Sequence, residues 1–462
     1  MQQPNIVTEY LEVVRQQIRW KKAQFPVLEE INNHITDQKN TFISDGLNEE
    51  EATDKAIVEM GDPIVVGEQL DRAHRPRPDW PLIVMTVTML ILGLAVQYFV
   101  RTNTPLGAWM FQNQIVWAGI AILVMLGAYF LDFTIIGKYP KVVFFALSAI
   151  TLASYLFTGG SRSISVIYLL LLFPTAFAGF VYMMRNEGYG GLILCGVAFI
   201  IPAYLSMIIS NVTILFLIWT SCLIILTAAV GKGWFKVGKL FATIILSIQT
   251  LAVLSTPFFM DMVGNQYVWG KMLDMLNPST DPLGYGYISA VIQRLLSHSQ
   301  FIGQGLPIRG YGEYSALSLL PAANSDFLLT CLIYRFGWIV LIGIIAIFAA
   351  FIMRAIILCK KQKGVLGFLV SLAIISTFSA QFIVYITSNL GFWRLDPLSL
   401  PLISYGGRAL VTNMCLIGFL LSVFRTGNLV RDKAGVSVAK SSHLIQYDNG
   451  KIIIDLKAHF IK

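Results

Sequence analysis

Hydrophobic residues dominate the chain from Trp80 onward and are grouped into long runs. Each run is near the length that a helix needs to cross the hydrocarbon of a membrane, which is about 20 residues. We count ten such runs, at about residues 82–100, 114–131, 142–157, 164–184, 190–209, 212–230, 238–256, 327–353, 364–387 and 409–426. The pattern therefore predicts an all-α polytopic membrane protein with ten transmembrane helices.

The first 78 residues follow a different pattern, in which apolar side chains recur every three or four positions. Two stripes of this kind are formed by Ile6, Tyr10, Val14 and Ile18, and by Leu28, Ile31, Ile35 and Phe42. Asn48 followed by Glu51 predicts a capping box that opens a third helix. The chain is therefore expected to contain a helical prefix domain (residues 1–78), a ten-helix membrane domain (79–430) and a C-terminal tail (431–462).

The orientation of the helices follows from the basic residues in their short connections. If the runs alternate in direction, these residues all fall on one side: Arg72, Arg75, Arg77, Lys138, Lys141, Arg185, Lys232, Lys236, Lys239, Arg354, Lys360, Lys361, Lys363, Arg431 and Lys433. Cytoplasmic loops carry the excess of lysine and arginine. We therefore expect both termini, the prefix domain and the tail to be cytoplasmic.

Composition excludes a soluble protein. Hydrophobic residues make up 56% of the 462 and charged residues 13%, against about 45–50% and about 25% in soluble domains. The net charge of +8 is uneven, because residues 1–78 carry 9 basic and 14 acidic side chains, and the rest of the chain carries 25 basic and only 12 acidic ones. The few acidic residues beyond position 78 are therefore informative by their positions.

One connection is much longer than the others, between the seventh and eighth apolar runs. It covers about residues 257–325 and falls on the outer side of the membrane. Loops of this length inside a compact fold are usually functional. Six of the 12 acidic residues lie on this side: Asp261, Asp274, Asp281, Glu313, Asp326 and Asp396. Any chemistry is therefore expected at the outer membrane surface.

Other kinds of site have no support in the sequence. Five cysteines stand in or beside apolar runs without a CxxC spacing, which indicates buried inert thiols rather than disulfides or a metal site. The chain has no Walker A or GxGxxG sequence. We therefore expect no nucleotide site, no metal held by cysteine and no nucleic acid partner.

Asp326 stands where the outer connection becomes the eighth apolar run. A carboxylate that is partly removed from water becomes a stronger base, so Asp326 is a candidate general base. The alternative is that Asn324, Ser325 or Asp326 caps the helix N-terminus, and the two roles do not exclude each other. Arg335 is predicted two and a half turns deeper in the same helix, where it needs a partner or a wet cavity.

Prolines and paired glycines precede the last apolar run, between Pro397 and Arg408. Irregular backbone near membrane depth must be buried in protein or line a cavity. The amides of Gly406 and Gly407, beside Arg408 and a helix N-terminus, could hold an anion such as a pyrophosphate. A plain re-entrant turn is the alternative.

Three basic residues give the long outer connection a cationic side: Lys271, Arg294 and Arg309. Such a surface suits an acidic lipid headgroup or a phosphate. The alternative is that all three are solvated loop charges.

The C-terminal half resembles the SEDS (shape, elongation, division, sporulation) family, the FtsW/RodA/SpoVE group of bacterial cell-wall proteins. Four stretches carry the resemblance: Tyr267 and Lys271 with Leu276-Asn277-Pro278, Asp281-Pro282 and Gly284 to Tyr287; Gly303-Gln304-Gly305-Leu306; Leu320-Pro321 with Asp326-Phe327 and Gly337; and Asn389-Leu390-Gly391 with Leu400 to Gly407, Gly418 and Leu420 to Arg425. Their order and spacing cover roughly residues 80–430. Residues 1–78 are similar to the short helical prefix domains of some Firmicute membrane proteins.

The resemblance implies a peptidoglycan glycosyltransferase that polymerises lipid II, the undecaprenyl-pyrophosphate-linked disaccharide peptide, at the outer face of the bacterial plasma membrane. Asp326 matches the catalytic aspartate of the family. The candidate substrate-binding residues are Lys271, Arg294, Arg309, Ser404, Tyr405, Gly406, Gly407 and Arg408. Lys271 and Ser404 to Gly407 stand in the matching motifs, whereas Arg408 stands where the family has a serine. A divalent cation such as Mg²⁺ could assist the basic residues, and the implied partners are lipid II, membrane lipids and a class B penicillin-binding transpeptidase.

Several polar positions of the family motifs are replaced in this chain. Phe173-Pro174-Thr175-Ala176 stands where the family has Gln-Pro-Ser-Glu, and Tyr334-Arg335-Phe336-Gly337 stands where it has Glu-Glu-Leu-Gly. These changes keep a second hypothesis open, in which the protein is a non-catalytic scaffold that binds lipid II or a transporter of a lipid-linked precursor.

Overall fold

The computed structural model describes residues 6–100, 105–158, 164–209, 211–256, 258, 287–308, 320–392, 398–427, 445–448 and 451–454. Lys271, Arg309 and most of the long connection lie outside these residues. The regular structure described is helical apart from a two-stranded antiparallel hairpin, β1 (Ile445–Asp448) and β2 (Lys451–Ile454). The hairpin belongs to a separate unit, Arg431–Lys462.

Four amphipathic helices make up the N-terminal region: α1 (Ile6–Gln17), α2 (Lys21–Ser44), α3 (Glu49–Met60) and α4 (Pro63–His74). The two apolar stripes of the sequence pack together, with Tyr10, Val14, Ile31 and Ile35 in one buried cluster. The expected capping box is present in part, because the Asn48 side chain accepts a 2.8 Å hydrogen bond from the Glu51 amide.

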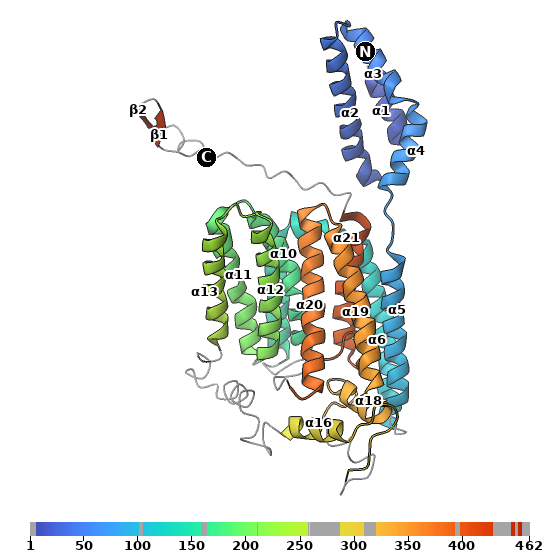
Figure 1. The fold of residues 1–462 in the computed structure, drawn as a ribbon, viewed down its shortest axis with the longest axis vertical. Helices are drawn as coiled ribbons and strands as arrows, with labels where there is room; N and C mark the ends of the chain where they lie inside the picture. The colour runs from blue at the N-terminus through green and yellow to red at the C-terminus, as the bar shows by residue number, and fades with distance from the viewer. Residues whose placement is uncertain are drawn as a thin grey trace. The chain divides into compact units, whose positions relative to one another are not determined.

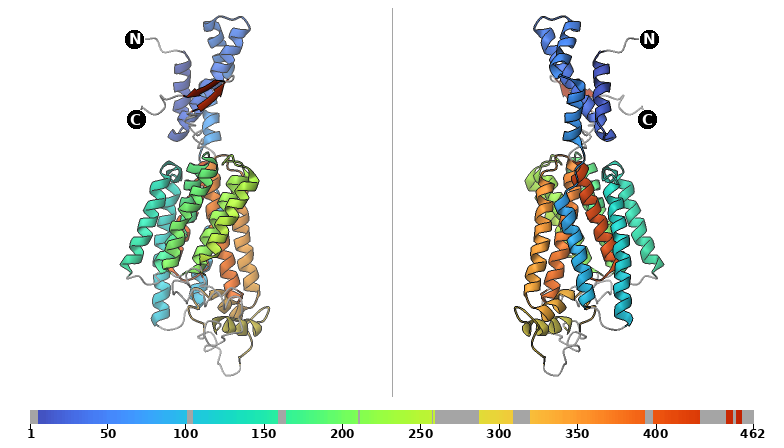
Figure 2. Two further views of the ribbon diagram at one scale, coloured as in Figure 1. Left: turned by 90° about the vertical axis from the view of Figure 1, so that its left-hand side faces the viewer. Right: turned by 90° about the vertical axis from the view of Figure 1, so that its right-hand side faces the viewer.

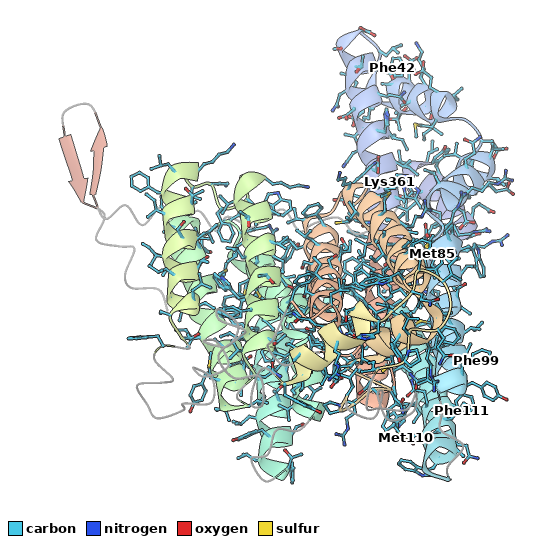
Figure 3. The ribbon with its side chains drawn as sticks, turned by 60° about the horizontal axis from the view of Figure 1, so that its bottom comes forward. Phe42, Met85, Phe99, Met110, Phe111 and Lys361 are labelled. Carbon is cyan, nitrogen blue, oxygen red and sulfur yellow. The ribbon has the colours of Figure 1, made fainter. Side chains whose placement is uncertain are left out.

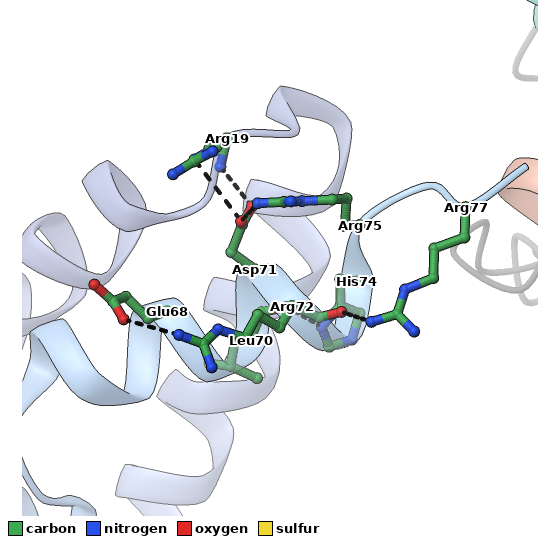
Figure 4. A network of polar contacts seen from close by, with 8 residues as sticks. All are labelled: Arg19, Glu68, Leu70, Asp71, Arg72, His74, Arg75 and Arg77. Atoms are coloured by element: carbon green, nitrogen blue, oxygen red, sulfur yellow. Dashed lines mark hydrogen bonds and ion pairs between the residues drawn. The ribbon is translucent and has the colours of Figure 1, made fainter.

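A polar network joins α4 to the loop after α1 (Figure 4). Asp71 is buried and accepts hydrogen bonds from the Arg75 side chain at 2.8 Å and from the Arg19 amide at 3.0 Å. Burial alone would raise the pKa of this carboxyl. The hydrogen bonds and the charges of Arg75 and Arg19 outweigh burial and hold the pKa below its ordinary value.

The membrane region consists of apolar helices that run side by side (Figures 1 and 2). Their bounds are α5 (Trp80–Val100), α6 (Pro105–Phe130), α8 (Pro140–Phe157), α9 (Ile164–Leu170), α10 (Phe173–Met184), α11 (Gly188–Ile208), α12 (Val212–Gly231), α13 (Lys239–Leu254), α19 (Ile339–Lys360), α20 (Val365–Asn389) and α21 (Gly407–Thr426), with short α7 (Thr134–Lys138) before α8.

Within the described residues, nine spans are long and apolar enough to cross a membrane, with α9 and α10 sharing one of them. Another apolar helix, α13, has only 16 residues. The predicted all-α polytopic fold is therefore confirmed. The count of ten spans remains a prediction.

Helices α10, α12, α20 and α21 form the centre of the bundle. Between 61% and 72% of the residues in their apolar windows are buried, compared with 17% in α8 and 22% in α19. Aromatic stacking joins an outer helix to a central one, since the ring centroids of Phe348 on α19 and Phe382 on α20 lie 4.3 Å apart and the rings are nearly parallel. Apolar side chains on the outer helices point away from the bundle, as hydrocarbon surroundings allow.

The two ends of the bundle differ in chemistry. At one end, Asp79 caps α5 through the Leu82 amide and forms a 2.6 Å ion pair with Arg354 near the end of α19. We call this the Asp79 end; Lys361 lies toward it, while Phe99 and Phe111 lie toward the other (Figure 3). Helices α16 (Tyr287–Ser297) and α18 (Leu328–Phe336) lie at the opposite end, called here the Asp326 end (Figure 1).

The single apolar run expected at 327–353 is broken in the structure. It forms α18 and α19, with a break at Gly337, whose φ is +95°. A Cβ at this position would lie 2.5 Å from the Phe301 carbonyl oxygen. The segment after α16 fills the break, with the Gly305 amide donating to the Tyr334 carbonyl at 2.7 Å.

This break corrects the expected position of Arg335. It is not deep in a long helix that begins at Asp326, but in the last turn of the nine-residue α18. The adjoining Phe336 carbonyl accepts a 3.0 Å hydrogen bond from Gly303, at the Asp326 end of the bundle. Arg335 is half-buried there.

Candidate active site

Two irregular segments meet at the Asp326 end. The first, residues 320–327, precedes α18 and is called here the aspartate turn; the second, residues 398–406, precedes α21 and is called the Tyr405 loop. The Ser404 hydroxyl donates to the Ser325 carbonyl at 2.7 Å, and the Tyr405 amide donates to the Asn324 carbonyl at 3.1 Å. The two segments are thus joined immediately beside Asp326.

The C-terminal end of α20 holds the aspartate turn from a second direction. Asn389 is fully buried, and its amide donates to the Asp326 carbonyl oxygen at 2.9 Å. The same side chain accepts from the Thr330 amide at 3.1 Å, and Tyr385 accepts from the Leu329 amide at 3.0 Å. Two α20 side chains therefore satisfy amides in the first turn of α18.

The alternative capping role of Asn324, Ser325 or Asp326 can be compared with this geometry. The N-cap residue of α18 is Phe327, whose side chain makes no capping hydrogen bond. The amides that a cap would bind are taken by α20 instead. Asp326 is half-buried, as expected for a carboxylate partly removed from water.

Two tyrosines lie within electrostatic reach of the Asp326 carboxylate, Tyr168 on α9 and Tyr385 on α20. The Tyr168 hydroxyl forms a 2.5 Å hydrogen bond with the Ser399 hydroxyl of the Tyr405 loop. The Tyr385 hydroxyl accepts from the Leu329 amide at 3.0 Å. Both buried hydroxyl groups are thus bonded to segments of the site, one to the Tyr405 loop and one to α18.

The structure places Ser404, Tyr405 and Gly406 as links within the protein. Ser404 and Tyr405 bind the aspartate turn, and the Tyr405 hydroxyl accepts from Asn113 of α6 at 3.2 Å. The Gly406 amide donates to the Gln114 side chain at 3.2 Å. An anion held by the amides of Gly406 and Gly407 would therefore need Gly406 to release Gln114.

The remaining candidates differ in accessibility. Gly407 packs on the Trp117 ring, with no room for a Cβ, and Arg408 next to it is exposed. Arg294 is exposed on α16, while Val291 and Leu295 of the same helix are buried. Both arginines can meet a ligand at the Asp326 end, whereas Lys271 and Arg309 lie outside the described residues.

An apolar groove of about 280 Å³ opens beside this site. Helices α5, α18 and α19 form its walls, and Ile403 of the Tyr405 loop lines it. Its lining is entirely apolar, which suits a hydrocarbon chain. A ligand with a lipid tail and a polar head could thus place the tail in the groove and the head near the Tyr405 loop.

The described residues do not provide a dedicated metal site. They contain no cluster of three or more His, Cys, Asp or Glu side chains. Mg²⁺ is usually bound by one or two carboxylates together with substrate phosphates, and Asp326 is the carboxylate identified here. The other outer carboxylates, Asp261, Asp274, Asp281, Glu313 and Asp396, lie outside the described residues, so we derive no step through a cation.

Several residues of the site were assigned no role from the sequence, although Asn389 stands in a motif of the family resemblance: Gln97, Asn113, Gln114, Tyr168, Tyr385 and Asn389. Their common signal is a polar side chain inside or at the end of an apolar run. Such residues generally face the interior of a helix bundle. That signal could have selected Gln97 and Asn389, but not the segments that they contact.

Known proteins are similar to this chain in sequence and in fold. The family model FTSW_RODA_SPOVE, described as "Cell cycle protein", matches residues 80–428. "Probable peptidoglycan glycosyltransferase FtsW" of Halothiobacillus neapolitanus is 28% identical over 184 residues, 39% of this chain and 43% of that protein. The protein of the same name from Geobacter metallireducens is 31% identical over 179 residues, 38% of this chain and 46% of that protein. The matches thus span less than half of either relative.

A solved structure shares the fold. It is described as "Structural coordination of polymerization and crosslinking by a peptidoglycan synthase complex". The likeness has a TM-score of 0.58 at 18% identity and covers 77% of this chain and 99% of that one. At this identity, the likeness concerns the arrangement of helices alone.

Proposed function

The chain belongs to the FtsW/RodA/SpoVE family of cell cycle proteins, which makes it a multi-pass protein of the bacterial plasma membrane, and we propose that it is a glycosyltransferase that polymerises lipid II. The observation that carries the proposal is the half-buried Asp326, on a turn fixed by α20 and the Tyr405 loop. The curated relatives bear the name of this activity.

In the proposed reaction, Asp326 is the general base. Its carboxylate takes the proton from the 4-hydroxyl of the acceptor GlcNAc, and the oxygen attacks the anomeric carbon of the donor MurNAc. The bond from that carbon to the pyrophosphate breaks, and undecaprenyl pyrophosphate leaves with the electron pair. A general base in such a step contributes about 10²–10⁴-fold in rate.

The leaving pyrophosphate needs positive charge where its own charge develops. Exposed Arg294 and Arg408 are the described candidates, and we propose that Lys271 and Arg309 complete the set. The apolar groove between α5, α18 and α19 supports a lipid-linked substrate, because it offers a place for part of the polyprenyl chain.

This reaction requires the Asp326 end to face outward. We propose that the Asp79 end and both termini are cytoplasmic, in agreement with the basic residues near that end, such as Lys360 and Lys361. We also propose a class B penicillin-binding transpeptidase as partner. The similar solved structure supports a partner of this kind, since its description joins polymerisation to crosslinking.

A direct test uses the full-length protein in lipid nanodiscs supplied with purified lipid II. Wild type should form glycan strands, and Asp326→Asn should not. Asp132→Asn is the matched control, because Asp132 is also half-buried in a turn, where it accepts from the Thr134 amide at 3.1 Å, but it follows α6 at the Asp79 end. Equal polymerisation by wild type and Asp326→Asn would refute the assignment.

One observation favours the second function, a scaffold that binds lipid II without polymerising it. The segment from Phe173 to Ala176, where the family has Gln-Pro-Ser-Glu, is buried, and the Thr175 hydroxyl has no hydrogen-bond partner among the described residues. No carboxylate stands in that segment. A scaffold would bind lipid II equally well as wild type and as Asp326→Asn, and neither would make polymer.

A further inference from the structure

Gln97 links the two segments that form the candidate site. It lies in the last turn of α5 and is 6% exposed. Its Nε2 donates to the Asn324 carbonyl at 3.1 Å and to the Ile403 carbonyl at 3.4 Å. Asn324 stands two residues before Asp326, and Ile403 directly precedes Ser404. A single amide group thus binds both the aspartate turn and the Tyr405 loop.

The same face of α5 also touches the Tyr405 loop through its backbone. Gly93 lies one turn before Gln97, so the two residues share a face of the helix. A Cβ at Gly93 would stand 2.5 Å from the Leu402 carbonyl oxygen and 2.8 Å from the Ile403 Cα. Only glycine allows this approach, and it brings the Gln97 amide within reach of the loop.

Both segments hold a backbone conformation that needs outside support. Ala322 in the aspartate turn has φ +52°, and Leu402 in the Tyr405 loop has φ +67°. A side chain other than glycine in this region costs roughly 1–2 kcal/mol, and such a conformation persists only where the surroundings hold it. The link from Gln97 to Asn324 and Ile403, beside those two residues, is part of that support.

We infer that Gln97 is a positioning residue, which fixes Asp326 relative to the Tyr405 loop without touching the substrate. The part of this inference that is tested by the rate of lipid II polymerisation rests on the proposed function. A catalytic group has to be held within about 0.5 Å of its productive place, and a misplacement of about 1 Å can cost about 100-fold in rate. Because Gln97 acts through Asn324, its loss should lower kcat more than it changes the KM for lipid II.

The first test is Gln97→Met in the full-length protein in nanodiscs, because methionine keeps the length of the side chain and removes its donor. We expect kcat to fall by about 10–100-fold while KM stays within about twofold. Thr86→Val is the matched control, since Thr86 is equally buried in α5 but bonds only the Leu82 carbonyl of its own helix. The inference is overturned by an unchanged kcat in Gln97→Met, or by an equal loss in Thr86→Val.

A second measurement is independent of enzymatic activity. Hydrogen–deuterium exchange should become faster in residues 398–408 of Gln97→Met, because the Tyr405 amide loses its fixed acceptor at Asn324, while exchange along α12 should not change. Unchanged exchange in residues 398–408 overturns the inference. An inactive wild type combined with faster exchange in the variant supports the positioning contact and refutes the proposed function.

A third variant covers the case in which Gln97→Met does not fold. Gln97→Asn keeps the amide on a side chain one methylene shorter, which cannot span both carbonyls. It should show a smaller loss of kcat in the same direction and faster exchange in residues 398–408. Wild-type values of both quantities in this variant overturn the inference.

Discussion

At the scale of single residues, Asn389 decides how the aspartate turn joins the bundle. Its side chain donates to the carbonyls of Asp326 and Tyr385 and accepts from Thr330, all in a fully buried position. Replacing it with leucine leaves buried groups unpaired, at about 1–3 kcal/mol for each. The position of Asp326 should therefore depend strongly on Asn389.

We predict that Asn389→Leu lowers the unfolding temperature and the polymerisation rate, the latter by more than about tenfold. Thr387→Val is the control, because the Thr387 hydroxyl bonds only carbonyls of its own helix, Ile383 and Val384. Thermal unfolding and lipid II polymerisation of the two variants measure the difference. Wild-type behaviour of Asn389→Leu would show that the turn is held by other contacts.

Asp71 provides a prediction about pH in the N-terminal region. Its pKa lies below the ordinary value in the folded protein, through Arg75 and Arg19, so its contribution to stability is present above the unfolded pKa of about 3.9 and is lost as the pH falls through the lower folded pKa. We predict that Asp71→Asn destabilises this region by about 2 kcal/mol at pH 7 and by much less at a pH below the lowered folded pKa. Hydrogen exchange of α4 in the full-length protein at both pH values measures this, and an equal effect at both would contradict it.

At the scale of elements, the break between α18 and α19 gives the Asp326 end its form. The sequence predicts one helix over residues 327–353, because the run is apolar throughout and long enough to cross a membrane. What ends α18 is the segment after α16, whose Phe301 carbonyl occupies the space beside Gly337. Periodicity cannot reveal such a contact, whereas α20 and α21, which are continuous, begin and end within a few residues of the predicted limits.

We predict that Gly337→Ala destabilises the protein by about 1–3 kcal/mol, because the position has φ +95° and no room for a Cβ. Gly343→Ala in α19 is the matched control, since a Cβ there meets nothing within 4 Å, and alanine favours the helix by about 1 kcal/mol. Thermal unfolding should rank Gly337→Ala below wild type and Gly343→Ala at or above it. The reverse order would contradict the account of the break.

At the scale of the whole molecule, the family motif identifies Asp326 and the Tyr405 loop from the sequence, but not what holds them together. Gln97 precedes Asn324 by 227 positions and Ile403 by 306, and no local pattern connects residues so far apart. The proposed orientation belongs to this scale too, because it concerns which end of the bundle meets the cell exterior.

We predict that a cysteine at the exposed Ser297 of α16 reacts with a membrane-impermeant maleimide in intact cells, and that a cysteine at the exposed Ser44 of α2 reacts only after permeabilisation. Four native cysteines are buried and Cys415 is half-buried, so labelling of the wild type provides the background to subtract. Labelling of Ser44→Cys, but not of Ser297→Cys, in intact cells would contradict the proposed orientation and indicate the opposite one.

The role of Asp326 as general base can be measured by comparing the polymerisation of lipid II by wild type and by Asp326→Asn. Asparagine keeps the size and hydrogen-bonding shape of the side chain and removes the base, so the rate of glycan formation should fall by at least about 100-fold, with Asp132→Asn close to wild type. Glycan strands formed at the same rate by Asp326→Asn would contradict the claim that Asp326 is the general base of a glycosyltransferase.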